Sequence, residues 1–253
     1  MIETGIRVIS ELRQEVEARE KIRIPLVWFV RFQRSWGEYV ENDSAAAFAG
    51  PVTEGYDGFA MARDQLLELL RRGDEVGWHY HAYNYVHRDD LSHATRLEIL
   101  RADLAACARD LRQAHPEFPV RSLRFGWFFV PDYAIYDELS GLGIVRDASI
   151  DPGRGDGPVG PFSARHLRPL VTAPTRIDGL TLFPFSKTVL MHDWTVVAHD
   201  FGWSRLEKAE AADKRRRFVN TLAAIAARLK QADGEFLTYE TAPASMLEGP
   251  AGE

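Results

Sequence analysis

The amino-acid sequence predicts an α/β fold with a barrel-like parallel sheet, and three observations support this prediction. Short apolar segments typical of strands alternate with longer segments whose apolar residues have helical spacing. Residues 24–30 are almost continuously apolar, as expected for a strand buried on both faces of a parallel sheet. No repeat or low-complexity linker divides the 253 residues, so we expect a single domain over 1–253.

Hydrophobic periodicity and the positions of Gly and Pro place the expected elements along the chain. Gly73 follows the second helix, where a glycine commonly ends a helix. Residues 33–56 and 151–178 are rich in polar residues, Gly and Pro, and we expect long loops there. The expected helices are 4–20, 57–72, 92–114, 131–142 and 204–232, and the expected strands are 24–30, 75–81, 120–126, 145–149, 180–185, 188–191 and 235–239.

Composition narrows the class of protein. Hydrophobic residues make up 45% of the chain and charged residues 27%, which is typical of a soluble globular protein. The net charge of −6 argues against nucleic acid or an anionic membrane as the main partner. Cys107 is the only cysteine, so neither an internal disulfide nor a cysteine-based zinc site is expected. With no apolar run long enough for a membrane span and no signal-peptide pattern, we expect a cytoplasmic protein.

His79 and His81 are the first candidates for chemistry. Residues i and i+2 of a strand point to the same face, so two imidazoles at a strand end can share one divalent metal, commonly zinc. An H-x-H pair is by itself a weak signal. The competing interpretation is one packed and one exposed histidine, with Tyr80 and Tyr83 forming an aromatic wall.

Two further candidates lie at the ends of other expected strands, where the chemistry of parallel barrels is located. Arg124 can hold a carboxylate through two parallel hydrogen bonds, or it can form a structural ion pair. His192 can donate a proton to a leaving group, because its ordinary pKa is near neutral, or it can be a surface residue. We interpret the remaining histidines as surface residues, namely His87, His93, His115, His166 and His199.

Three segments, in this order, resemble the polysaccharide deacetylases of the NodB-homology family. Residues 72–79, RGDEVGWH, are similar to the family's second motif, in which a strand presents a metal-binding histidine. Residues 123–127, LRFGW, followed by LGIVRDAS at 142–149, are similar to its third motif and the continuation of that motif. Residues 189–193, VLMHD, then a long helix and GEFLT at 234–238, are similar to its ending.

This resemblance implies a distorted (β/α) barrel and a metal-dependent hydrolase that removes an N-acetyl group from an amino sugar or glycan. It implies that His79 and His81 hold a divalent metal, which we expect to be zinc, and that Arg124 orients a catalytic aspartate. His192 would protonate the departing amine. Trp127, Tyr83 and Trp78 are the expected substrate contacts, because flat aromatic rings stack on sugars.

The sequence departs from the family at two places. The second motif usually has histidines four residues apart, but position 83 is Tyr, so His81 would be the second ligand. The family's first motif is an Asp-Asp pair ending a first strand, and no such strand precedes 24–30. We therefore expect an upstream extension carrying that strand, an unpaired edge on 24–30, and low activity without it. The alternative is an inactive carbohydrate-binding relative. The nearby aspartates that can be named as replacements are Asp43, Asp147, Asp151 and Asp193.

Overall fold

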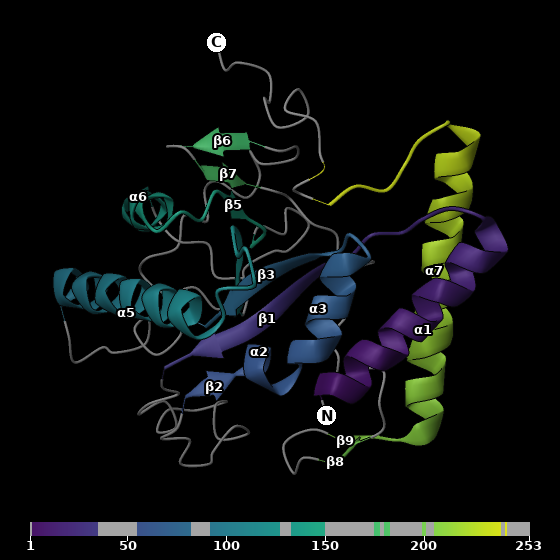
Figure 1. The fold of residues 1–253 in the computed structure, drawn as a ribbon, viewed down its shortest axis with the longest axis horizontal. Helices are drawn as coiled ribbons and strands as arrows, with labels where there is room; N and C mark the ends of the chain where they lie inside the picture. Colours follow the sequence, from purple (N-terminus) through teal and green to yellow (C-terminus); the bar gives the residue numbers. More distant parts are fainter. Residues whose placement is uncertain are drawn as a thin grey trace.

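A seven-stranded mixed sheet forms the centre of the fold (Figure 1). Its strands are β1 (Val27–Gln33), β2 (Tyr56–Asp57), β3 (Glu75–Tyr80), β4 (Ser122–Phe125), β5 (Arg146–Asp147), β6 (Thr175–Ile177) and β7 (Leu180–Leu182). The order across the sheet is β2-β1-β3-β4-β5-β7-β6. The inner five strands are parallel, and β2 and β6 pair antiparallel at the two edges. The α/β class predicted from the sequence is confirmed.

Six helices and a small second sheet complete the described part of the chain. The helices are α1 (Ile2–Glu20), α2 (Gly58–Met61), α3 (Arg63–Arg71), α5 (His93–Ala114), α6 (Tyr133–Gly141) and α7 (Lys208–Gln231). Strands β8 (His199–Asp200) and β9 (Arg205–Leu206) pair antiparallel. This computed structural model describes residues 2–34, 55–81, 92–126, 133–149, 175–177, 180–182, 199–200, 205–238 and 241. None of its described helices has the length and hydropathy needed to cross a bilayer.

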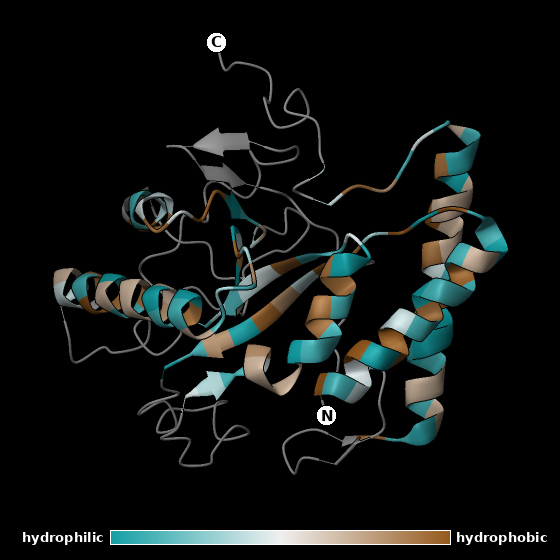
Figure 2. Cartoon of the chain, viewed as in Figure 1, coloured by the Kyte–Doolittle hydropathy of each residue, from teal (hydrophilic) through white to brown (hydrophobic). Residues whose placement is uncertain are grey.

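Alternation along the strands separates an apolar face of the sheet from a polar one. In β3, Val76, Trp78 and Tyr80 belong to the main core, whereas His79 lies between them in sequence and points to the other face. Hydrophobic residues run along β1 and β3 in Figure 2. Helices α2, α3, α5 and α6 also contribute to this core, through residues such as Phe59, Leu66, Leu104 and Leu139.

A second core forms between α1 and α7, which lie side by side in Figure 1. Val8, Ile9 and Val16 of α1 meet Phe218 and Leu222 of α7. A capping box begins α7: the Glu207 side chain accepts from the backbone N–H of the third helical residue, Glu210, whose own side chain accepts from the Glu207 N–H. The contacts of the second core bury the apolar stripes of α1 and α7 against each other.

Several expected elements differ in detail from the observed ones. The expected helix 57–72 is divided at Ala62 into α2 and α3, although Gly73 follows it with a φ of +79° as predicted. The strand predicted at 235–239 is wrong over 235–238, which pair with no strand of the described residues, and the Thr238 N–H donates to Thr241 Oγ1 instead. Strand β6 falls inside an expected loop. The strand expected at 188–191 lies outside the described residues.

The edge of β1 that faces away from β3 is covered in part. Phe32 and Gln33 pair antiparallel with Asp57 and Tyr56 of β2. Over the described residues no strand pairs with this edge between Val27 and Arg31. The pairing with β2 therefore lies beyond residue 30, where the strand expected at 24–30 ends, because β1 extends to Gln33.

Candidate functional site

The carboxyl ends of β1, β3 and β4 bring several polar side chains together on the face opposite the main core. The parallel register places Arg31 of β1 and Arg124 of β4 on either side of His79. His81 directly follows β3 and lies beside Gly126, which directly follows β4. The two histidines are half-buried.

The imidazoles of His79 and His81 converge on each other. Their Nε2 atoms lie 3.0 Å apart, and the rings meet edge to face with centroids 4.7 Å apart. His79 Nδ1 lies 2.9 Å from the backbone carbonyl oxygen of Arg124. Because a carbonyl oxygen only accepts, we assign the ring proton of neutral His79 to Nδ1, which leaves a lone pair on Nε2. Without a metal, His81 Nε2 can donate to that lone pair.

The same geometry fits a metal held between the two rings. Two nitrogens that each lie ~2.1 Å from one tetrahedral zinc ion are roughly 3.4 Å apart, so the two Nε2 atoms, which are 3.0 Å apart, need to separate by only about 0.4 Å to share the ion. The carbonyl of Arg124 fixes the tautomer of His79 in the way that backbone acceptors commonly orient metal-binding histidines. His79 and His81 are therefore the described residues that could hold a divalent ion.

Two neighbours hold His81 in place. A Cβ at position 126 would overlap the His81 ring, so only glycine leaves room for the imidazole there. Gln33 Nε2 donates to the His81 carbonyl oxygen at 2.9 Å, and the Gln33 amide oxygen accepts from Arg31 Nε and one terminal nitrogen. Arg31 and Gln33 were not expected at this site from the sequence. The available signal was the change from an apolar run to polar residues at alternate positions near the end of a strand.

The other predicted site residues differ in how well the structure supports them. Arg124 is buried at the end of β4, beside His79, as expected from its place in the sequence. Trp78 has no exposed surface, packs edge to face on Tyr80, and donates from Nε1 to the Phe32 carbonyl oxygen. Its burial on the opposite face of β3 does not support the predicted substrate contact, because successive strand residues point to opposite faces. Tyr83, Trp127 and His192 lie outside the described residues.

His115 corrects another expectation, since it is buried and not on the surface. Its ring stacks on Phe59 with centroids 5.6 Å apart, and its Nε2 lies 2.8 Å from a carboxylate oxygen of Asp57. Asp57 also accepts from the N–H of Ala60 and so begins α2. The pair therefore joins the end of α5 to the start of α2 and has a structural role.

Asp147 is a fully buried carboxyl at the end of β5. Its Oδ1 accepts hydrogen bonds from the N–H and the hydroxyl of Ser149, and Ser149 Oγ in turn accepts from the N–H of Phe125. Its Oδ2 is buried without a hydrogen-bond partner among the described residues. Burial raises the pKa of Asp147 to about 7, against the lowering effects of the Ser149 hydrogen bonds and the Arg124 charge.

An Asp147→Asn variant should therefore change how stability depends on pH. The folded-state pKa lies above the ordinary 3.8, so the native protein keeps a proton that the unfolded chain releases between about pH 4 and 7. Wild-type stability contributed by Asp147 is present below that window and is lost across it. Denaturant unfolding at pH 4 and pH 8 should show the stability difference, variant minus wild type, rising by on the order of 4 kcal/mol. Parallel pH profiles would contradict the assignment.

Within the described ranges, no group of three or more His, Cys, Asp and Glu side chains forms a metal cluster. Three of the aspartates considered as replacements, Asp43, Asp151 and Asp193, lie outside those ranges. Comparison of the chain with protein-family models, curated proteins and solved structures found no match.

Proposed function

We propose that this chain is a metal-dependent hydrolase that removes an N-acetyl group from an amino sugar or glycan, within a barrel of the polysaccharide-deacetylase type. The observation that carries the proposal is the convergence of His79 Nε2 and His81 Nε2 at 3.0 Å at the carboxyl end of a parallel strand. Polar chemistry at this end of the strands is the arrangement expected of such barrels. Zinc is the expected ion, because two imidazoles suit it well.

Each residue of the proposed site has a separate task. A metal bound there would polarise the acetamide carbonyl and lower the pKa of a bound water. His79 and His81 would hold the ion, and the Arg124 carbonyl keeps the ring proton of neutral His79 on Nδ1, so that Nε2 carries the lone pair. The Arg124 guanidinium orients a carboxylate, and His192 donates the proton that the leaving amine needs.

Asp147 is the one candidate base among the described residues. Its carboxyl lies close enough to Arg124 for the guanidinium charge to lower its pKa, and burial brings that pKa to about 7. A base with a pKa near the working pH is suited to proton abstraction. Its complete burial requires that Oδ2 be reached through a neighbouring side chain or a water, since the atom has no surface of its own.

A non-catalytic carbohydrate-binding relative is the second candidate function. An observation at the end of β1 favours it: the side chain that contacts the backbone of His81 there is the neutral amide of Gln33 and not a carboxylate that could act as a base. No described carboxylate forms a cluster with the two histidines. A site that lacks a catalytic base would still bind a carbohydrate but would not hydrolyse it.

The double variant His79→Ala, His81→Ala tests the metal site. Purified wild type loaded with zinc and then dialysed is expected to retain about one zinc per chain, and the double variant close to none, by elemental analysis. His115→Gln is the control, because this buried histidine packs against Phe59 and Phe118 of the main core, on the face of the sheet opposite His79, and its replacement should leave zinc content unchanged. Equal zinc in wild type and double variant would remove the metal site.

Release of acetate from N-acetylated chito-oligosaccharides by the zinc-loaded wild type would then distinguish the two functions. Zinc retention with acetate release supports the hydrolase, and His192→Ala should in that case lower kcat more than it raises KM. Zinc retention and oligosaccharide binding without acetate release would support the carbohydrate-binding relative.

A further inference from the structure

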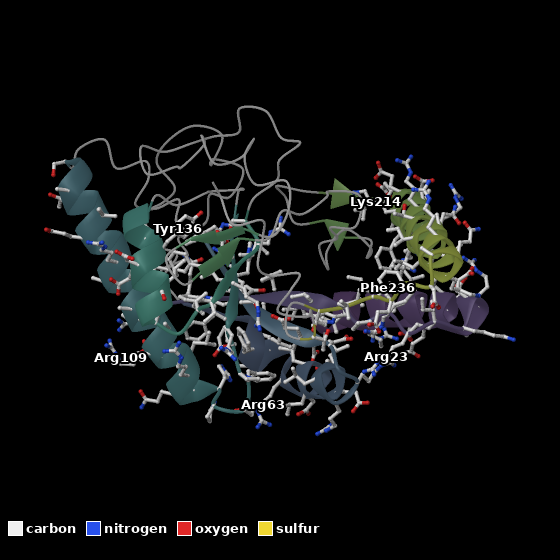
Figure 3. The ribbon with its side chains drawn as sticks, turned by 90° about the horizontal axis from the view of Figure 1, so that it is seen from above. Arg23, Arg63, Arg109, Tyr136, Lys214 and Phe236 are labelled. Atoms are coloured by element: carbon white, nitrogen blue, oxygen red, sulfur yellow. The ribbon has the colours of Figure 1, made fainter. Side chains whose placement is uncertain are left out.

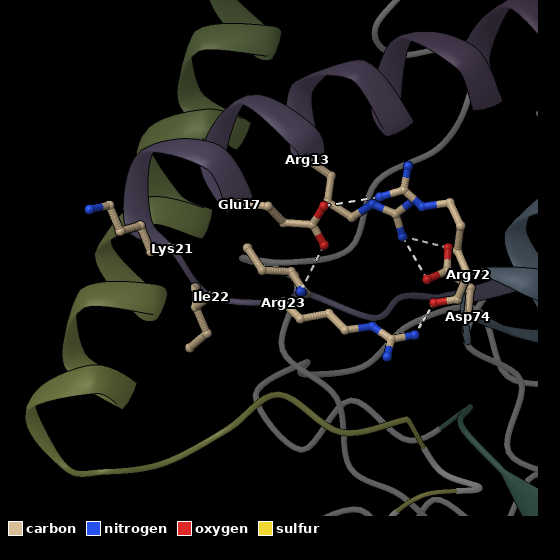
Figure 4. Close-up of a pocket in the computed structure, with 8 residues that line it drawn as sticks. Arg13, Glu17, Lys21, Ile22, Arg23, Arg72 and Asp74 are labelled. Atoms are coloured by element: carbon tan, nitrogen blue, oxygen red, sulfur yellow. Dashed lines mark hydrogen bonds and ion pairs between the residues drawn. The ribbon is translucent and has the colours of Figure 1, made fainter.

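A pocket of about 390 Å³ lies at the other end of β3 from the two histidines (Figure 4). Asp74, directly before β3, lines it, whereas His81 directly follows the strand, so the pocket and the histidines lie roughly 20 Å apart. The pocket is formed by the end of α1, the segment after it, and the end of α3. Its lining residues are Arg13, Glu17, Lys21, Ile22, Arg23, Ile24, Arg72 and Asp74.

The lining carries an excess of positive charge. Its four cationic and two acidic side chains leave two positive charges in surplus. Both acids are already engaged: Asp74 with Arg13 at 2.5 Å, and Glu17 with Arg72 at 3.0 Å. Among the described residues, Lys21 and Arg23 have no carboxylate within 4 Å.

Two cationic side chains of the lining stand out: Arg23 is held in position by its neighbours, and Arg13 has buried donors without acceptors. Arg23 crosses over Gly73, where any Cβ would overlap its guanidinium, and it donates to the Arg72 carbonyl oxygen. Arg13 is 1% exposed, and its Nε and one terminal nitrogen are buried without a hydrogen-bond partner among the described residues. Buried donors that lack acceptors are uncommon, because leaving them unpaired is costly.

The ends of α1 and α3 offer a competing explanation, since cations often neutralise the negative end of a helix. Each helix end is equivalent to roughly half a negative charge, so the two together offset about one of the two surplus charges. Lys230 of α7 adds a further cation here, because its Nζ donates to the Glu20 carbonyl oxygen at the end of α1. The helix ends therefore leave the pocket positive.

We propose that this pocket binds a small oxyanion, and specifically the phosphate group of a small phosphorylated molecule. Lys21 and Arg23 would contact the phosphate oxygens, since ammonium and guanidinium groups form charge-assisted hydrogen bonds with phosphate. The volume exceeds that of a bare phosphate, and Ile22 and Ile24 provide apolar wall for the rest of the molecule. The site does not depend on the histidine pair, so it stands whether or not the chain is a hydrolase.

Titration calorimetry with inorganic phosphate and with glycerol 3-phosphate, at constant ionic strength, tests the proposal. Saturable binding of at least one probe to wild type is expected, weakened at least about tenfold in a Lys21→Gln, Arg23→Gln variant. Both replaced side chains are exposed, so the fold should tolerate the change. Arg23→Lys keeps the charge and is expected to retain binding. Tighter binding of glycerol 3-phosphate than of phosphate would assign the site to a phosphorylated molecule, and the reverse order would assign it to free phosphate and overturn that part.

The control is Arg109→Gln. Arg109 lies on α5, at the opposite end of the molecule from α1 and α7 (Figure 3), and binding should be unchanged when it is replaced. Absence of saturable binding to wild type would overturn the proposal. Undiminished binding in the double variant, or equal loss in Arg109→Gln, would overturn it as well, because the charge of the whole molecule and not the pocket would then be responsible.

Discussion

Replacing Arg13 by methionine is expected to lower the free energy of unfolding by about 3–5 kcal/mol. The Arg13 and Asp74 side chains are each 1% exposed, and one guanidinium nitrogen lies 2.6 and 2.5 Å from the two carboxylate oxygens. Asp74 also accepts from the Leu26 N–H and from Trp28 Nε1. Methionine fills a similar volume but leaves this carboxylate buried without its counter-charge. Denaturant unfolding followed by circular dichroism measures the loss.

Arg7→Met is the matched control, since it places the same substitution on the same helix. Arg7 is 66% exposed and its pair with Glu11 spans 3.6 Å, so the change should stay within about 0.5 kcal/mol. Adding Asp74→Asn to Arg13→Met should recover part of the stability, because the unpaired charge is then gone. A loss below about 1 kcal/mol for Arg13→Met would show that the pair does not hold α1 to the sheet.

Gly126→Ala is expected to weaken zinc binding by about 10–100-fold while leaving the fold intact. The new methyl group would occupy the space of the His81 imidazole, which must then rotate away from His79. Gln33 holds the His81 backbone through the carbonyl oxygen, so the ring and not the chain should move. A competition titration with a zinc-binding dye gives the affinity, and circular dichroism checks the fold.

Gly141→Ala is the corresponding control, because no atom lies within 4 Å of the Cβ it would add. Gly141 is the last residue of α6, far in sequence from the histidines, and zinc affinity should not change. An unchanged affinity in Gly126→Ala would mean that His81 does not need its present position to bind the ion. Comparable losses in both variants would point to a general effect of the substitution.

The five parallel strands and the two histidines could be predicted because they depend on local patterns. The alternation in residues 75–80 identifies β3, and the H-x-H spacing places both imidazoles on one face. The same alternation excludes Trp78 from that face, so its assignment as a substrate contact could have been avoided from the sequence alone. The rule that separates His79 from Trp78 is the two-residue period of a strand.

The surroundings of these residues depend on contacts between distant parts of the chain. Gln33 meets His81 because of the register between β1 and β3, which joins positions 48 apart. His115 can be buried because its Nε2–H donates a hydrogen bond to the carboxylate of Asp57, 58 positions away in the sequence. The pocket between α1 and α3 likewise needs two helices to end at the same place. Periodicity within one segment carries no information on such pairings.

The two cores differ in when they can form during synthesis. Every described buried member of the main core lies at or before Ile144, whereas the core between α1 and α7 needs residues 218–226. At ribosomal rates of ~5–20 residues per second, α1 waits roughly 10–40 s for α7. Throughout that interval Val8, Ile9 and Val16 expose an apolar stripe on a nascent chain whose sheet can already have folded. Temporary cover by a chaperone would therefore fall on α1, and α7 would displace it as translation ends.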